Sequence, residues 1–129
     1  MLTIGIKGRE EVMVTEENTA KAMGSGTLDV FATPAMTALM EMTAWKSVAP
    51  FLEDGDGTVG TLLQITHDAP TPLGMKVFCE SELLEIDGRR LVFHVAAFDE
   101  KGKIGEGRHE RFVINNEKIA PKAEKKREK

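Results

Sequence analysis

One long apolar segment, residues 33–50, constrains the fold more than any other feature of the sequence. It reads TPAMTALMEMTAWKSVAP, and Thr33 before Pro34 is a typical helix start, with a hydroxyl N-cap followed by proline at the first helical position. The apolar pattern continues to about Pro50, so we expect one long helix. A helix that is apolar on most of its sides has to be enclosed by other elements. The rest of the chain must therefore cover it.

We expect four strand-like segments, which follow the turn sequence LEDGDGT, to cover this helix. Runs of apolar residues mark them, and Asp87-Gly88 between the second and third is a typical two-residue hairpin signal. The segments are TVGTLLQITHDA, MKVFCESELLEI, RRLVFHVAAF and IGEGRHERFVIN. Because tight turns join these consecutive strands, we expect an antiparallel sheet.

The N-terminal part of the chain is expected to add one strand and one short helix. Apolar residues alternate in MLTIGIKG, which predicts a half-buried strand over residues 1–8. The sequence TEENTAKAM predicts a short helix, with Thr15 as its cap and Gly24 as its end.

The order of these elements predicts the fold class. It indicates an α+β protein in which a curved antiparallel β-sheet wraps around one long central helix, the arrangement known as the hot-dog fold. The 129 residues have room for one such domain, which we place at residues 1–116, and residues 117–129 form a charge-dense tail that is interpreted as a solvated or frayed end. Since no second helix is predicted to cover the sheet, we expect a second copy of the chain to meet its free surface or edge.

Composition and charge exclude several classes of protein. The formal net charge of -4 at pH 7 gives no sign of a nucleic-acid partner. Glu41 and Lys46 interrupt the apolar stretch well before the roughly 20 residues that a bilayer requires, and the N-terminus lacks a signal pattern. We therefore expect no membrane contact and a cytoplasmic location. Cys79 is the single cysteine, so no internal disulfide or metal site is expected, and we interpret it as a core or strand residue.

Two titratable residues are predicted to point toward the interior. At about 100° per residue, Glu41 shares a helix face with Trp45, whereas the polar Thr43 lies on the opposite side. His67 has the same strand parity as Val59, so it is expected to face inward as well. One inward histidine is more often a core residue than a catalytic one, and Glu41 alone also fits the edge of a subunit contact. The pair, together with the hydroxyl at the helix start, favours a functional site.

These groups suit the transfer of an acyl group to water. A carboxylate in a low-dielectric pocket gains proton affinity, which fits Glu41 as a general base for water or as a nucleophile on an activated acyl carbon. His67 then holds, relays or donates the proton while a thiolate leaves. Free amides at the helix N-terminus, near Thr33, polarise the carbonyl. Thioesters suit such a site because the thiolate is a good leaving group.

Four stretches of the sequence carry a recognisable pattern: VFATPAMTALMEMTAW, GTVGTLLQITHDAPTPLGMKV, EIDGRRLVFHVAAFDE and IGEGRHERFVI. Its most specific part is the ordered set Thr33, Glu41 and His67, spaced by eight and then twenty-six residues. The pattern resembles the hot-dog thioesterases of the fluoroacetyl-CoA thioesterase type. The glycine of that family falls on Gly60 and its arginine on Arg111.

The resemblance implies a homodimer that binds acyl-CoA at its interface, with active-site groups from both protomers. It implies that Thr33, Glu41 and His67 hydrolyse the thioester, and that Gly60 and Arg111 help to bind the substrate. The expected enzyme is a thioester hydrolase without a cofactor, since coenzyme A is part of the substrate.

Some residues have alternative interpretations. Arg111 also fits a structural ion pair, for example with Glu110, and Gly60 also fits a bulge or a close-approach glycine. His94 and His109 match no catalytic position, so they are assigned to strand packing or to the surface.

The segment before the long helix bears on the acyl group. MGSGTLDV contains no aromatic side chain to shape a tight lid for a fluorinated acyl group. The sequence therefore predicts a general short-chain acyl-CoA as substrate. Two alternatives stay open: a hot-dog hydratase or dehydratase of 3-hydroxyacyl thioesters, and a non-catalytic acyl-CoA-binding module.

Overall fold

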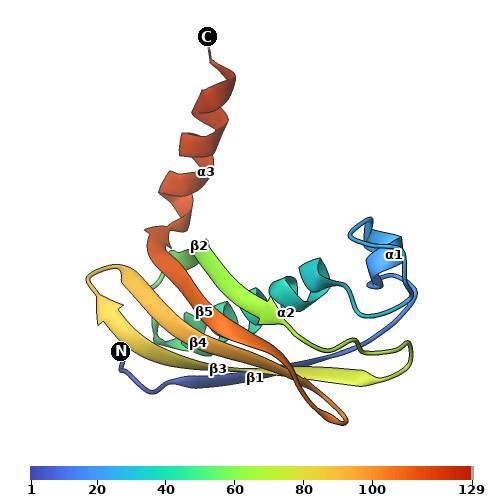
Figure 1. Ribbon diagram of the computed structural model, residues 1–129. Helices are drawn as coiled ribbons and strands as arrows, with labels where there is room; N and C mark the ends of the chain where they lie inside the picture. Colours follow the sequence, from blue (N-terminus) through green and yellow to red (C-terminus); the bar gives the residue numbers. More distant parts are fainter. Residues whose placement is uncertain (129) are drawn as a thin grey trace.

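The computed structural model describes residues 1–128, which form one antiparallel β-sheet with a long helix along one of its faces (Figure 1). The strands lie in the order β1-β3-β4-β5-β2, so β1 and β2 are the two edges. The predicted α+β architecture, a curved sheet around one central helix, is confirmed. The elements are β1 (Lys7–Met13), α1 (Ala20–Met23), α2 (Thr33–Val48), β2 (Asp56–His67), β3 (Lys76–Asp87), β4 (Arg90–Asp99), β5 (Gly102–Asn115) and α3 (Asn116–Glu124), with 3-10 turns at Ala49–Phe51 and Lys125–Arg127.

The core lies between α2 and the sheet. Met36, Met40 and Ala44 of α2 are fully buried and belong to one cluster with apolar residues of the central strands, such as Phe93 of β4. Burying one such large side chain stabilises the fold by roughly 1.5–3 kcal/mol. Cys79 is part of this core, as predicted, and burial raises the pKa of its thiol to about 11. The thiol is therefore protonated near neutral pH.

The helix face that carries Glu41 is more exposed than predicted. Trp45 is 42% exposed and Glu41 is half-buried, whereas the polar Thr43 is buried. The Thr43 hydroxyl donates to the backbone carbonyl of Leu39, so its burial leaves no donor unpaired. Because α2 is apolar on nearly all sides, its periodicity did not distinguish the face toward the sheet. The structure therefore leaves an apolar face of α2 outside the core.

β2 is an edge strand with a bulge. In the described part of the chain it pairs with β5 alone, and its register shifts between Gly60 and Leu62. Val59 pairs with Phe112 and His67 with Gly105, and these two partners lie an odd number of residues apart on β5. Side chains alternate along a strand, so Val59 and His67 face opposite sides of the sheet. The predicted shared face is wrong because the bulge inverts the alternation.

The N-terminal elements are shifted from their predicted positions. The first strand, β1, begins at Lys7, and the alternating apolar residues on which the prediction rested precede it. β1 itself is rich in charged residues, so its sequence carries no apolar alternation. α1 is capped by Thr19 rather than Thr15, and it ends at Gly24, as predicted, with a left-handed φ of 72°.

The charged C-terminal segment forms α3, which projects away from the sheet (Figure 1). The Asn115 side chain caps this helix by accepting a hydrogen bond from the backbone N–H of Glu117. The expected solvated end is therefore exposed, but it is helical rather than frayed. No helix within residues 1–128 is long and apolar enough to cross a membrane.

Candidate active site

Thr33 and His67 join the start of α2 to the end of β2. The distance from Thr33 Oγ1 to His67 Nδ1 is 2.7 Å. Thr33 is the first helical residue and not the cap, because Ala32 has the extended conformation of the N-cap position. The sequence-based assignment of Thr33 as the cap is therefore wrong by one residue. This shift leaves the hydroxyl free to bind the imidazole.

The Thr33–His67 pair borders a cavity of about 270 Å³, with small residues such as Ser25 and Ala69 in its wall. His67 Nε2 is buried and has no hydrogen-bond partner within the described chain. Burial lowers the pKa of His67 below its ordinary value, and the Asp68 carboxylate opposes this effect. His67 is therefore mainly neutral at pH 7, and Nε2 is the ring atom left for a ligand.

About two turns further along α2, Glu41 meets Arg111 of β5. Arg111 Nη1 lies 3.5 Å from Glu41 Oε2, which makes a loose ion pair. The guanidinium is buried, and it donates from Nε to the Thr58 hydroxyl at 2.7 Å and from Nη2 to the Thr58 carbonyl at 3.0 Å. The ion-pair partner of Arg111 is therefore Glu41, whereas Glu110 pairs with Arg108.

Gly60 makes room for this ion pair on β2. A Cβ atom at this position would lie 2.6 Å from Glu41 Oε2 and 3.3 Å from Arg111 Nη1. Any side chain here would displace the Glu41 carboxylate. Gly60 also adjoins the β2 bulge, which fits its interpretation as a bulge or close-approach glycine.

His109 completes the Glu41 cluster, and sequence reasoning missed it. It is fully buried, with Nε2 3.1 Å from Arg111 Nη1 and Nδ1 2.8 Å from the carbonyl oxygen of Leu62. Burial is the main reason that its pKa is lowered, and the Arg111 charge acts in the same direction. The sequence did contain a signal for His109. It lies two residues before Arg111, and residues two apart on a strand share a face.

The two clusters lie on the flank of α2 that faces β2, but they do not form one hydrogen-bonded set. Eight residues separate Thr33 from Glu41, which corresponds to about 12 Å of helix rise. Within residues 1–128, no hydrogen bond joins the Glu41 cluster to the Thr33–His67 pair. One chain therefore brings Thr33 to His67, and Gly60 and Arg111 to Glu41, while the two groups stay apart.

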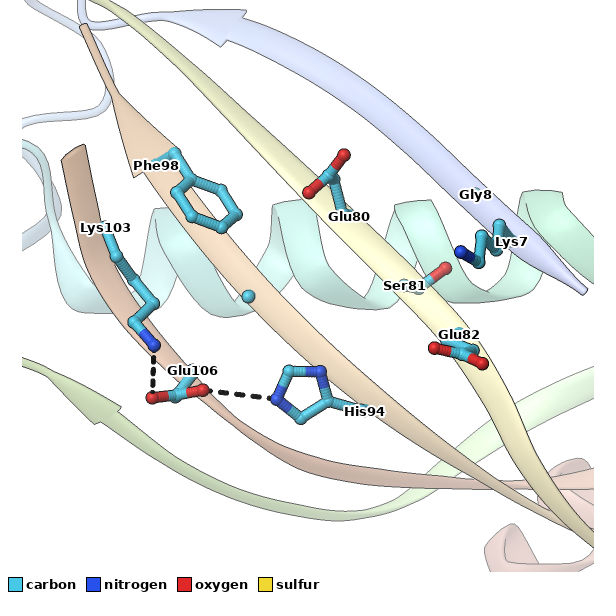
Figure 2. A pocket seen from close by; sticks show the side chains of 10 residues that line it. Lys7, Gly8, Glu80, Ser81, Glu82, His94, Phe98, Lys103 and Glu106 are labelled. Atoms are coloured by element: carbon cyan, nitrogen blue, oxygen red, sulfur yellow. Dashed lines mark hydrogen bonds and ion pairs between the residues drawn. The ribbon is translucent and has the colours of Figure 1, made fainter. Parts of the chain in front are cut away.

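A second hollow lies on the opposite face of the sheet. Figure 2 shows several of its side chains, among them Glu80, His94 and Glu106, in front of the strands and α2 behind them. Glu106 accepts a hydrogen bond from Lys103 at 2.7 Å and lies 3.2 Å from His94 Nε2. His94 is thus a surface residue, as one interpretation of the sequence held. Within residues 1–128, no three His, Cys, Asp or Glu side chains are grouped so that they hold a metal ion.

Comparison with known proteins places the chain in a family. The fluoroacetyl-CoA-specific thioesterase family matches residues 14–117 of the sequence. The chain belongs to this family. The fluoroacetyl-CoA thioesterase of Streptantibioticus cattleyicolor is 45% identical over 98 residues, which cover 76% of this chain and 70% of that protein.

Solved structures of the fluoroacetyl-CoA-specific thioesterase family and of related enzymes share the fold. A fluoroacetyl-CoA thioesterase superposes with a TM-score of 0.92 at 36% identity, over 98% of both chains. A thioesterase superfamily member of Thermus thermophilus has a TM-score of 0.91 at 29% identity, over 99% of this chain and 95% of its own. These findings confirm the predicted family, the hot-dog fold and the class of activity, acyl-CoA thioester hydrolysis.

Membership of the fluoroacetyl-CoA-specific thioesterase family does not by itself assign roles to side chains. The catalytic assignment of Thr33, Glu41 and His67 stays a prediction, as does the assignment of Gly60 and Arg111 to substrate binding. The structure adds their geometry: within residues 1–128, each of the three Arg111 side-chain nitrogens has a hydrogen-bond partner, whereas His67 Nε2 has none.

Proposed function

We propose that this thioester hydrolase cleaves a short-chain acyl-CoA to the free acid and coenzyme A, with Thr33, Glu41 and His67 as catalytic residues. One observation carries the proposal. The Thr33–His67 pair borders a cavity, and the half-exposed Glu41 carboxylate lies on the same flank of the same helix. The proposed reaction uses side chains and water, and it needs no cofactor beyond the coenzyme A that the substrate carries.

Glu41 is assigned the attack on the thioester. It either removes a proton from water as the water oxygen attacks the carbonyl carbon, or attacks that carbon itself to form an anhydride that water then hydrolyses. The carbon–sulfur bond breaks and its electron pair leaves with sulfur. His67 relays to the thiolate the proton that water gives up, so the imidazole is neutral before and after the reaction. Solvent oxygen-18 recovered in Glu41 after a single turnover identifies Glu41 as the nucleophile, and its absence there argues against that role.

The start of α2 is assigned the stabilisation of the reacting carbonyl. The first turn of a helix has backbone N–H groups without intrahelical partners, and they favour negative charge on a carbonyl oxygen. The Thr33 hydroxyl holds the imidazole of His67 at this end of the helix. A thioester bound in the cavity therefore meets both the proton donor and the positive end of the helix dipole.

The cavity beside Thr33 and His67 favours a short acyl group. Its volume of about 270 Å³ is below the roughly 300–1,000 Å³ of sites that enclose drug-sized ligands. The segment before α2 contributes Ser25, Val30 and the buried aromatic side chain of Phe31 to the wall. The cavity therefore fits the acyl end of the substrate, with the rest of coenzyme A outside it.

A homodimer with active sites at its interface is part of the same proposal. The free edge of β2 supports it, together with the exposed apolar side chains Trp45, Val59, Leu62 and Leu63 beside that edge. A second copy at this edge is expected to bring groups of both protomers together and so to close the gap of about 12 Å between the two clusters. We also propose a cytoplasmic location, as predicted from the sequence.

Release of free coenzyme A from a panel of acyl-CoAs tests the reaction. We expect thiol release from short-chain substrates by the wild type and its near-complete loss in Glu41→Gln and His67→Ala. Hydration or alkene formation without thiol release indicates the hydratase instead. Acyl-CoA binding that survives Glu41→Gln, with no release by any variant, indicates a binding module.

Mixed dimers test whether the two protomers share each site. Glu41→Gln and His67→Ala chains are each expected to be inactive, but a heterodimer of the two keeps one intact site if Glu41 and His67 act across the interface. We then expect up to about half of the wild-type activity per dimer. An inactive heterodimer shows that both groups act within one chain, and a monomer in solution contradicts the interface altogether.

A further inference from the structure

His109 occupies the most enclosed position of the Glu41 cluster. It is fully buried on β5, its Nδ1 lies 2.8 Å from the Leu62 carbonyl oxygen, and its Nε2 lies 3.1 Å from Arg111 Nη1. A carbonyl oxygen only accepts a hydrogen bond, and a guanidinium only donates one. The two partners therefore fix a single tautomer, with the proton on Nδ1 and the lone pair on Nε2.

The Leu62 carbonyl connects His109 to the bulge of β2. The register shift between Gly60 and Leu62 interrupts the regular ladder between β2 and β5. A bulge leaves backbone groups that need partners from outside the ladder. His109 supplies the donor to Leu62, so the imidazole fixes the strand next to the glycine that accommodates Glu41.

Arg111 has three anchors, of which His109 is the one beside Glu41. Thr58 accepts from Nε and Nη2, and these bonds fix the plane of the guanidinium on the β2 side. Nη1 is left for Glu41 Oε2 at 3.5 Å and for His109 Nε2 at 3.1 Å. Loss of the acceptor on His109 therefore releases the nitrogen that contacts the carboxylate.

We propose that His109 is a positioning residue of the active site, which holds Nη1 of Arg111 against the Glu41 carboxylate and ties this pair to the β2 bulge. It acts through Arg111 and touches no substrate. The inference rests on the proposed function, because it matters for catalysis only if Glu41 reacts with the thioester. An apolar core role would require neither of its two hydrogen bonds.

Two conservative substitutions separate the two hydrogen bonds. In His109→Gln the amide oxygen reaches the place of Nε2 and accepts from Arg111, whereas in His109→Asn the amide N–H reaches the place of Nδ1 and donates to Leu62 only. We expect kcat of the Gln variant to stay within about threefold of wild type and kcat of the Asn variant to fall on the order of tenfold. We expect KM to change by less than about twofold in both. His94→Gln, on the far face of the sheet, is the matched control with unchanged kcat.

Thermal unfolding of the same variants distinguishes positioning from mere support of the fold. Equal losses of kcat in the Gln and Asn variants, or losses that follow their stability or appear in KM alone, overturn the inference. A lower kcat in Asn than in Gln at comparable stability supports it.

A nuclear magnetic resonance measurement needs no turnover. We expect the Arg111 side-chain N–H signals to show restricted rotation in wild type and in His109→Gln, and to lose it in His109→Asn. An unchanged Asn spectrum overturns the positioning role. A wild type that releases no coenzyme A from any substrate instead contradicts the proposed function, while these spectra still decide whether His109 orders Arg111.

Discussion

The two polar clusters along α2 differ in how completely their atoms are paired. At the start of the helix, the His67 side chain makes one hydrogen bond within residues 1–128, to Thr33, and its Nε2 is unpaired there beside a cavity. Two turns later, Arg111 and His109 are buried and bonded to each other, and Thr58 holds the guanidinium from β2. We call the Thr33–His67 pair the open cluster, because one of its polar atoms is unpaired beside a cavity. Glu41, Arg111 and His109 form the closed cluster, in which only the Glu41 carboxylate is half-exposed.

This difference separates groups that meet a ligand from groups that hold others in place. An unpaired polar atom gains a hydrogen bond when a ligand binds, whereas a saturated network can only transmit position. Glu41 is the half-exposed member of the closed cluster. We therefore expect substitutions of Glu41 and His67 to change the rate with little effect on stability, and substitutions of Arg111 and His109 to change stability as well.

The largest effect is expected for Glu41→Gln. Glutamine keeps the size and an oxygen that accepts from Arg111, but it can neither act as a base nor attack the acyl carbon. We expect kcat to fall by about 10³-fold and the free energy of unfolding to change by less than about 0.5 kcal/mol. Steady-state kinetics and urea unfolding measure the two quantities. Wild-type kcat in this variant would remove Glu41 from the reaction.

Arg111→Met tests the closed cluster. It removes the donor to Thr58 and His109 and leaves their buried acceptors unpaired. We expect a loss of about 2 kcal/mol in the free energy of unfolding. Thr33→Val, which removes a hydrogen bond of the open cluster, is the matched comparison, with an expected loss of at most about 1 kcal/mol. Equal losses in urea unfolding would show that the clusters do not differ in this way.

Gly60→Ala tests the contact between β2 and Glu41. The added Cβ would lie 2.6 Å from Glu41 Oε2, so the carboxylate has to move. We expect kcat to fall about tenfold. Gly57→Ala on the same strand is the control, because its Cβ would meet the Asn116 side chain at 2.6 Å instead and leave Glu41 untouched. A similar kcat in both variants would contradict a specific role for Gly60.

The smallest effect is expected in the pH dependence of stability. Both His67 and His109 have a pKa below the ordinary value, chiefly because of burial, so the unfolded chain binds protons more readily than the folded one. The contribution of these two neutral histidines to the free energy of unfolding is therefore fully present above about pH 6.5. It is lost as the pH falls through the lowered pKa values. The charged groups that face them are Asp68 for His67, and Arg111 with Glu41 for His109.

His109 is expected to dominate this pH dependence because it is fully buried beside a guanidinium, whereas His67 is only half-buried. Urea unfolding between pH 7 and pH 5 measures it. We expect His109→Gln to flatten the profile more than His67→Gln does. The opposite order would indicate that the closed cluster admits protons more easily than its burial implies.

The comparison also shows where the sequence was informative. Turn residues such as Asp87-Gly88 and runs of apolar residues predicted the helix and the four later strands close to their observed ranges. The spacing of Thr33, Glu41 and His67 pointed to the family that the comparisons confirm. Local signals were sufficient here because turn chemistry and periodicity act over a few residues.

Local signals failed where the packing of distant segments decides the outcome. The face of α2 that meets the sheet was predicted incorrectly, because both faces are apolar and only the sheet selects between them. No local pattern indicated that a bulge near Gly60 reverses the alternation of side chains along β2. Val59 was therefore placed on the wrong side of the strand. The first strand, β1, is a charged edge strand and lacked the expected alternation.

The sequence by itself determined the order of the elements and the residue types of the site, because both depend on short-range patterns. Only the tertiary structure decided which of these residues touch. It separated Thr33 and His67 from Glu41 by the rise of α2, paired Arg111 with Glu41 rather than Glu110, and brought in His109. The physical reason is that hydrogen bonds between distant strands depend on register, which a single bulge changes and no local pattern records.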